Sequence, residues 1–133
     1  MHRLKTRPQF QAAMAGGTVS RTAHFALHRL ALDSTGPQAL FAVAGSQGGA
    51  WLGAMVPKRW ARRAVTRNAI KRQIYAVARV FEPGMPHAAH VVRLRTGFDR
   101  KHFVSATSDA LKRAVRAELE QLFAAAERRE RAP

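Results

Sequence analysis

Apolar residues recur at helical spacing in the middle of the chain. Ile70, Ile74, Val77 and Phe81 follow one another at intervals of four, three and four residues. This spacing places the four side chains on one face of an α-helix, which we expect to run over residues 64–80. The opposite face is polar, so the pattern predicts a helix that packs on one side only.

Shorter patterns on either side predict two more helices and four strands. Thr6 is a suitable N-cap for a helix that ends before Gly16 and Gly17, since glycine accepts the left-handed conformation at helix ends. Within that helix, Phe10 and Met14 lie four residues apart and share one face. Alternating apolar positions bounded by turn residues predict the strands. The strands are expected at residues 22–32, 39–44, 51–56 and 90–94, and a final amphipathic helix at residues 105–126.

The predicted order of elements, α-β-β-β-α-β-α, is typical of a single α+β domain with helices packed on one sheet. We expect the domain to occupy residues 1–127 and residues 128–133 to form a disordered tail. The close spacing of the first three strands favours an antiparallel meander. With 133 residues, 47% of them apolar, the chain can bury a core of its own.

Positive charge is concentrated in the N-terminal two-thirds of the chain. The formal net charge is +15, from 23 Lys/Arg and 8 Asp/Glu. Within residues 1–81 the only acid is Asp33, whereas residues 57–79 carry eight Lys or Arg. Surface helices normally interleave both signs, and a uniformly cationic helix repels itself unless a polyanion neutralises it. The segment therefore predicts binding to the phosphates of a nucleic acid; a solvated cationic face is the simpler alternative.

The polar face of the central helix is distinctive in residue type as well as in charge. Asn68, Arg72, Tyr75 and Arg79 share the spacing of the apolar stripe, and Lys71 flanks them. Arginine suits phosphate because its planar guanidinium bonds two oxygens at once. Asn68 is explained equally well as an amide that contacts RNA and as a first-turn or capping residue. The loop before the helix extends the patch with Lys58, Arg59, Arg62 and Arg63.

Catalytic side chains are not indicated. The sequence has no cysteine, and its six histidines lack the spacing of a metal site. It has no nucleophile elbow and no Ser/His/Asp set. We therefore expect no catalytic residue and no metal ligand in this chain. No apolar run approaches the roughly 20 residues that cross a bilayer, so we expect no membrane partner and a cytoplasmic location.

The segment KRWARRAVTRNAIKRQIYAVAR resembles the signature of the bacterial ribonuclease P protein subunit. The resemblance implies a fold like the second domain of ribosomal protein S5, with helices on a four-stranded mixed sheet. It also implies an RNA subunit that holds the catalytic Mg²⁺, and a role in removing the 5′ leader of precursor tRNA. The family pattern falls on Lys58-Arg59, Arg62-Arg63, Ala64-Val65 and the run from Arg67 to Arg72.

The implied partners are ribonuclease P RNA and precursor tRNA, with no obligate protein partner. The sequence departs from the family at Met14, where a second aromatic residue is usual, and at Tyr75-Ala76, where Arg-Glu usually follows. Both departures concern contacts to the leader. The RNA-subunit surface is expected to comprise Lys58, Arg59, Arg62, Arg63, Arg67, Asn68, Lys71, Arg72 and Arg79, and the leader cleft Phe10, Met14, Phe25 and Tyr75.

Three other classes of protein share parts of this pattern. A structural RNA-binding protein, such as a ribosomal protein, fits the composition equally well. A DNA-binding protein would place the basic helix in a major groove, but the sequence lacks a clear helix-turn-helix pair. A nuclease that acts without an RNA subunit is the third class. The order of the Arg-Asn-x-Ile-Lys-Arg motif and of the elements favours the ribonuclease P family over all three.

Overall fold

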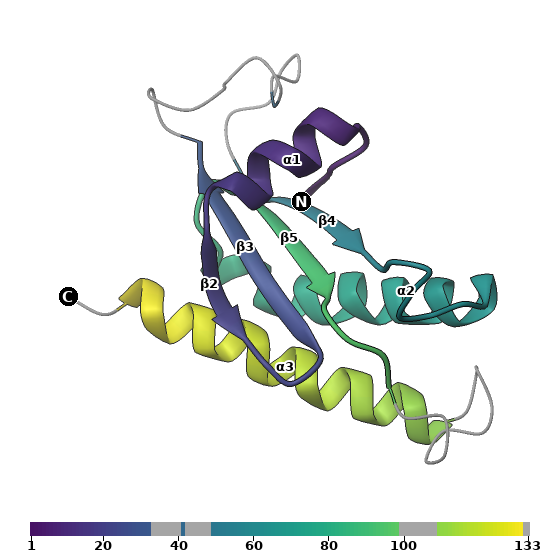
Figure 1. The fold of residues 1–133 in the computed structure, drawn as a ribbon. Helices are drawn as coiled ribbons and strands as arrows, with labels where there is room; N and C mark the ends of the chain where they lie inside the picture. The colour runs from purple at the N-terminus through teal and green to yellow at the C-terminus, as the bar shows by residue number, and fades with distance from the viewer. Residues whose placement is uncertain (33–40, 42–48, 99–108, 132–133) are drawn as a thin grey trace.

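The chain folds into three layers, with a sheet between one helix on one face and two helices on the other (Figure 1). The structure is a computed structural model that describes residues 1–32, 41, 49–98 and 109–131. Helix α1 (Arg7–Ala15) covers the first face, and α2 (Ala64–Phe81) and α3 (Asp109–Arg131) pack side by side against the second. No helix in these ranges is long and apolar enough to cross a membrane.

The sheet is mixed, as expected, but its described part has five strands rather than four. Its order is β1-β4-β5-β3-β2. The central strand β5 runs antiparallel to β3 and parallel to β4, and β1 runs parallel to β4. A 3₁₀ turn at Glu82–Gly84 follows α2. The strands are β1 (His2–Arg3), β2 (Thr18–Arg21), β3 (Phe25–Ala31), β4 (Trp51–Met55) and β5 (Ala88–Leu94).

Several sequence predictions need correction. The antiparallel meander is wrong, because β5 lies between β3 and β4 and pairs with both. Strand β2 was not predicted, since its four residues, TVSR, hold a single apolar side chain. The strand expected at residues 39–44 lies outside the described residues except for Phe41, which is buried edge-on against Trp51. Helix α3 continues to Arg131, so most of the expected tail is helical.

Helix α1 begins and ends where the sequence indicates. The Thr6 side chain accepts a hydrogen bond from the backbone N–H of Gln9, and the Gln9 side chain accepts one from the backbone N–H of Thr6, which forms a complete capping box. After the helix, Gly17 has φ +105°, a conformation that favours glycine. A second glycine sets the packing of the helix. A Cβ at Gly53 on β4 would lie 2.5 Å from Cε1 of Phe10, so only glycine admits this ring.

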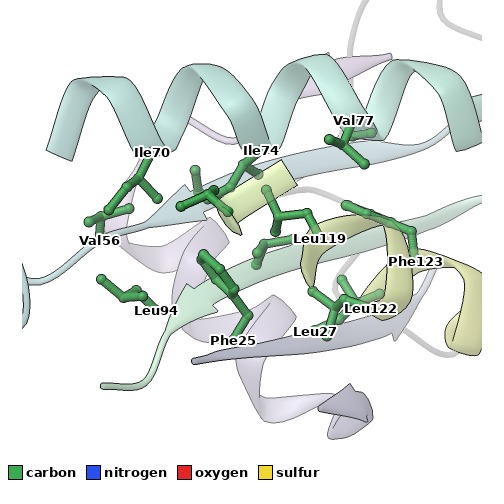
Figure 2. Close-up of a cluster of buried hydrophobic side chains, with 14 of the residues drawn as sticks. Phe25, Leu27, Val56, Ile70, Ile74, Val77, Leu94, Leu119, Leu122 and Phe123 are labelled. Carbon is green, nitrogen blue, oxygen red and sulfur yellow. The ribbon is translucent and has the colours of Figure 1, made fainter. Parts of the chain in front are cut away.

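The main core lies between the sheet and the pair α2 and α3 (Figure 2). The predicted stripe of α2 is confirmed, because Ile70, Ile74 and Val77 point from the helix into this cluster. Phe25 on β3 meets them from the sheet. Helix α3 contributes a matching stripe of Leu111, Val115, Leu119, Leu122 and Phe123.

A smaller core lies on the other face of the sheet, beneath α1. It includes Leu4, Ala13, Trp51 and Val91, with Phe10 packed against it from the helix. Because strand residues alternate between faces, each inner strand supplies side chains to both cores. The sheet therefore separates α1 from α2, and this separation decides which surface residues can act together.

Candidate nucleic-acid interface

The polar face of α2 is available to a ligand along most of its length. Asn68, Arg72 and Arg79 are exposed, and Lys71 is half-buried beside them. Lys71, Arg72 and Arg79 form no ion pair with an acid of the described ranges. The ion pairs found there join Met1 to Glu82, His24 to Glu118 and Arg29 to Glu130. Helix α2 thus presents a row of unneutralised donors, as its sequence predicts.

The loop before α2 adds to the same surface. Lys58, Arg59, Arg62 and Arg63 are exposed. The Arg59 guanidinium lies 5.1 Å from the centre of the Trp60 ring, a cation–π contact. This loop leads into the N-terminus of α2, where the partial positive charge of the helix dipole further favours an anion.

Arg67 has a different place from the one expected. Its side chain is half-buried, and Nη1 donates hydrogen bonds to the backbone carbonyls of Ala61 at 3.1 Å and Arg62 at 2.7 Å. The guanidinium therefore holds the basic loop against the first turn of α2. The sequence placed Arg67 among the RNA contacts, and the structure adds a positioning role that the motif alone did not reveal.

Asn68 does not cap the helix. The N-cap residue of α2 is Arg63, and no side chain caps this end. Asn68 lies in the second turn, exposed, and among the described residues its amide forms no hydrogen bond within the protein. Of the two explanations that the sequence left open, the capping role is excluded by this position.

Tyr75 lies on α2, on the face of the sheet opposite to α1. The guanidinium carbon of Arg3, on the edge strand β1, sits 4.1 Å from the centre of its ring. Sequence reasoning missed Arg3 as part of this surface, although the N-terminal cluster of Arg3, Lys5 and Arg7 was a signal. The contact extends the basic surface from α2 to the edge of the sheet.

The residues expected to line a leader cleft do not lie together. Phe25 is completely buried in the main core, so its assignment to the cleft is wrong. Tyr75 is separated from Phe10 and Met14 by the sheet. Phe10 and Met14 remain half-buried at the α1 face, so each has surface left for a ligand.

The α1 face also carries a polar cluster that the sequence did not indicate. Nε of Arg93 donates to Nε2 of His28 at 3.3 Å, and Nδ1 of His28 then donates to Oγ1 of Thr18 at 3.2 Å. Burial, with the charges of Arg93 and Arg21, lowers the pKa of His28. The ring therefore stays neutral at physiological pH, and the charge of this cluster resides on its two arginines. The signal in the sequence was a lone arginine within the apolar strand at residues 90–94.

Comparisons with known proteins place this surface in context. Residues 1–127 match the model of the family described as Ribonuclease P. The chain is 34% identical over 131 residues to the ribonuclease P protein component of Ralstonia pickettii, covering 98% of this chain and 83% of that protein. It is 36% identical over 122 residues to the component of Bordetella parapertussis, covering 91% and 88%.

Solved structures agree in fold. The ribonuclease P protein of Staphylococcus aureus superposes with a TM-score of 0.65 at 18% identity, covering 93% of this chain and 94% of that one. At this identity the similarity concerns the architecture alone. It shows that the two proteins share a fold, in which a mixed sheet carries one helix on one face and two helices on the other.

Proposed function

The chain belongs to the ribonuclease P protein family, and we propose that it binds the RNA subunit through the basic face of α2 and the loop before it. As a member of that family it is the protein subunit of ribonuclease P, part of an endoribonuclease complex that matures the 5′ ends of tRNA. The observation that carries the proposal is a row of cations that form no ion pair with a described residue. Arg62, Arg63 and Arg72 are exposed in this row, and Lys71 is half-buried.

Precursor tRNA is the proposed second ligand, bound at the α1 face. Phe10 and Met14 offer apolar surface for the bases of a single-stranded leader, and Arg93 and Arg21 offer charge for its phosphates. Stacking on aromatic side chains beside a basic track is the usual way of holding single-stranded RNA. Because the sheet separates this face from α2, the protein can contact two RNAs on opposite faces.

The RNA subunit, in this proposal, supplies the chemistry and holds the Mg²⁺ ions. Among the described residues, no three His, Cys, Asp or Glu side chains lie close enough together to share a metal ion. The part of the protein is electrostatic and positional. Its cations lower the repulsion between the phosphates of two RNAs and favour one alignment of the precursor. We place the holoenzyme in the cytoplasm, with no obligate protein partner.

Reconstitution with a ribonuclease P RNA tests the function. Cleavage of precursor tRNA is measured over a range of Mg²⁺ concentrations, with and without the protein. The protein is expected to lower the Mg²⁺ concentration needed for half-maximal cleavage. Identical Mg²⁺ curves would contradict the proposal and would favour a purely structural RNA-binding role. A control reaction without the RNA subunit should show no cleavage.

A further inference from the structure

An apolar groove runs between α2 and α3 and is not explained by the contacts assigned above. It has a volume of about 340 Å³. This lies at the low end of the range of small-molecule sites, roughly 300–1,000 Å³. Its walls are mainly apolar, with Arg116 and Glu120 from α3 as its polar members. The remaining lining residues are Ala76, Val77, Val80, Phe81 and Ala124.

Val80 is the most exposed large apolar side chain of the described residues, with 76% of its surface accessible. It lies at the groove, one turn beyond Ala76 on α2. A valine so exposed gains nothing from folding, because apolar surface left in water contributes no burial energy. Val65, 45% exposed, is a second such residue on α2, but it does not line the groove.

The groove adjoins the basic face directly. Ala76, which lines the groove, lies four residues after Arg72 and three before Arg79, so it is within one helical turn of both. On the opposite wall, Arg113 lies one turn before Arg116, and both are exposed. Cations therefore flank the groove on both helices, and a ligand with an anionic backbone is favoured over a second copy of a chain whose net charge is +15.

Arg116 and Glu120 supply both kinds of hydrogen-bonding group at the groove. Neither forms an ion pair or a side-chain hydrogen bond with another residue of the described ranges. A guanidinium donates to the carbonyl or ring nitrogen of a base, and a carboxylate accepts from its N–H groups. Apolar walls, one donor and one acceptor together match the flat face and the polar edge of a nucleobase.

From these observations we infer that the groove between α2 and α3 binds one unpaired base of the RNA subunit, while the flanking arginines hold the adjoining phosphates. The inference rests on the proposed function, since it assumes that α2 faces the RNA subunit. The base would stack on the side chains of Val80 and Ala76 and present its edge to Arg116 and Glu120.

Substitution of Val80 tests the inference with a matched control. Val80→Ser removes apolar surface but no charge, and because the side chain is exposed the fold should be retained. Its affinity for the RNA subunit should fall by about tenfold, because the apolar contact of the valine with the base is lost. Its dependence on salt should be unchanged, because no phosphate contact is lost. Ala117→Ser introduces a serine at an exposed position of α3 that does not line the groove, and it should bind as the unaltered protein does.

Photocrosslinking identifies the occupant. With p-benzoylphenylalanine in place of Val80, irradiation of the reconstituted holoenzyme should join the protein to one nucleotide of the RNA subunit. Crosslinks between two protein chains would overturn the inference, as would crosslinks scattered along the RNA. Equal affinities of the Val80→Ser and Ala117→Ser proteins would overturn it as well. Arg72→Ala separates this inference from the proposed function. If Val80→Ser has no effect but Arg72→Ala still reduces the salt dependence of RNA binding, only the groove assignment is wrong. If neither variant has an effect, the proposed RNA face of α2 is wrong as well.

Discussion

The guanidinium of Arg67 donates a hydrogen bond of 2.7 Å to the backbone carbonyl of Arg62. This contact joins the first turns of α2 to the loop that carries the exposed Arg62 and Arg63 side chains. A cation within the signature motif therefore acts partly on the protein itself, because it orders a segment that would otherwise lose conformational entropy when RNA binds.

Arg67→Ala should weaken both the fold and RNA binding. Loss of the hydrogen bonds to the loop is expected to lower the free energy of unfolding by about 1 kcal/mol, measured by urea denaturation. Arg67→Lys should restore the charge but not both hydrogen bonds, and so only part of the affinity for the RNA subunit. If Lys restores affinity completely, Arg67 acts as a simple point charge and the positioning role is wrong.

Arg72→Ala should change the salt dependence of binding without changing stability. Arg72 is exposed and forms no ion pair with a described residue. Loss of one phosphate contact should reduce the slope of log K against log salt concentration by about one. Arg128→Ala, on the exposed last turns of α3, is the control of equal charge. Equal slopes for the two variants would mean that the effect reflects net charge rather than the face of α2.

Phe10→Leu should weaken binding of the leader specifically. Leucine retains apolar contact with the sheet but lacks a ring on which a base can stack, and stacking contributes about 1–3 kcal/mol per base. The holoenzyme should therefore bind precursor tRNA less tightly, by about tenfold, with little change for mature tRNA. Similar losses for both RNAs would place Phe10 outside the leader site.

Gly53→Ala should destabilise the packing of α1. The added Cβ would lie 2.5 Å from Cε1 of Phe10 and 2.9 Å from Cδ1 of Leu4. Overpacking of this kind costs about 1–3 kcal/mol, measurable by thermal or urea unfolding. In a Phe10→Ala background the same substitution should cost clearly less, because the ring is gone. Additive costs would show that the two residues are not coupled.

Acid should destabilise the protein through His90. The side chain is fully buried, Nε2 accepts from Nε of Arg29 at 3.1 Å, and Nδ1 donates to the carbonyl of Trp51 at 3.1 Å. Burial, together with the charge of Arg29, lowers its pKa from 6.5 to about 4. The unfolded chain therefore binds a proton that the native protein does not bind between these pH values.

Above about pH 6.5, His90 is neutral in both states and does not reduce the free energy of unfolding. As the pH falls from there towards 4, protonation of His90 in the unfolded chain lowers the free energy of unfolding, by at most about 3 kcal/mol. Urea midpoints at pH 7 and pH 4.5 measure the loss. His90→Gln keeps a donor and an acceptor but cannot titrate, so it should lose less stability on acidification. His28, whose pKa is also lowered, accounts for part of the remainder; an unchanged loss in His90→Gln would exclude His90 as a source.

The helices were predictable because their signals are local. The stripe of Ile70, Ile74 and Val77 and the cap at Thr6 depend on residues within a turn or two of each other, and the structure confirms both. The class of ligand was predictable for a similar reason, since the cations of residues 57–79 stand together in the sequence without an acid. The motif then identified the family, which the comparisons confirm.

The pairing of strands and the composition of the site were not predictable in this way. Strand β5 lies between β3 and β4 because the packing of both cores, which involves residues far apart in the chain, decides how the strands pair. Strand β2 is short and polar, so it shows no alternation of apolar residues from which it could be predicted. The pattern of the strand favours core packing for Phe25, and only the family resemblance assigns it to the leader cleft. Its face of the sheet is covered by α2 and α3, which agrees with the pattern.

Composition and helical phase are properties of neighbouring residues, so they are enough to indicate one α+β domain with a cationic helix suited to RNA. Tertiary structure decided which cations are free and which are engaged: Arg67 bonds to the loop, Arg3 covers Tyr75, and Arg93 bonds to His28. It also decided that the two proposed RNA surfaces lie on opposite faces of the sheet and that a groove opens beside α2. These relationships join residues far apart in the chain, and only the packing of the layers brings them together.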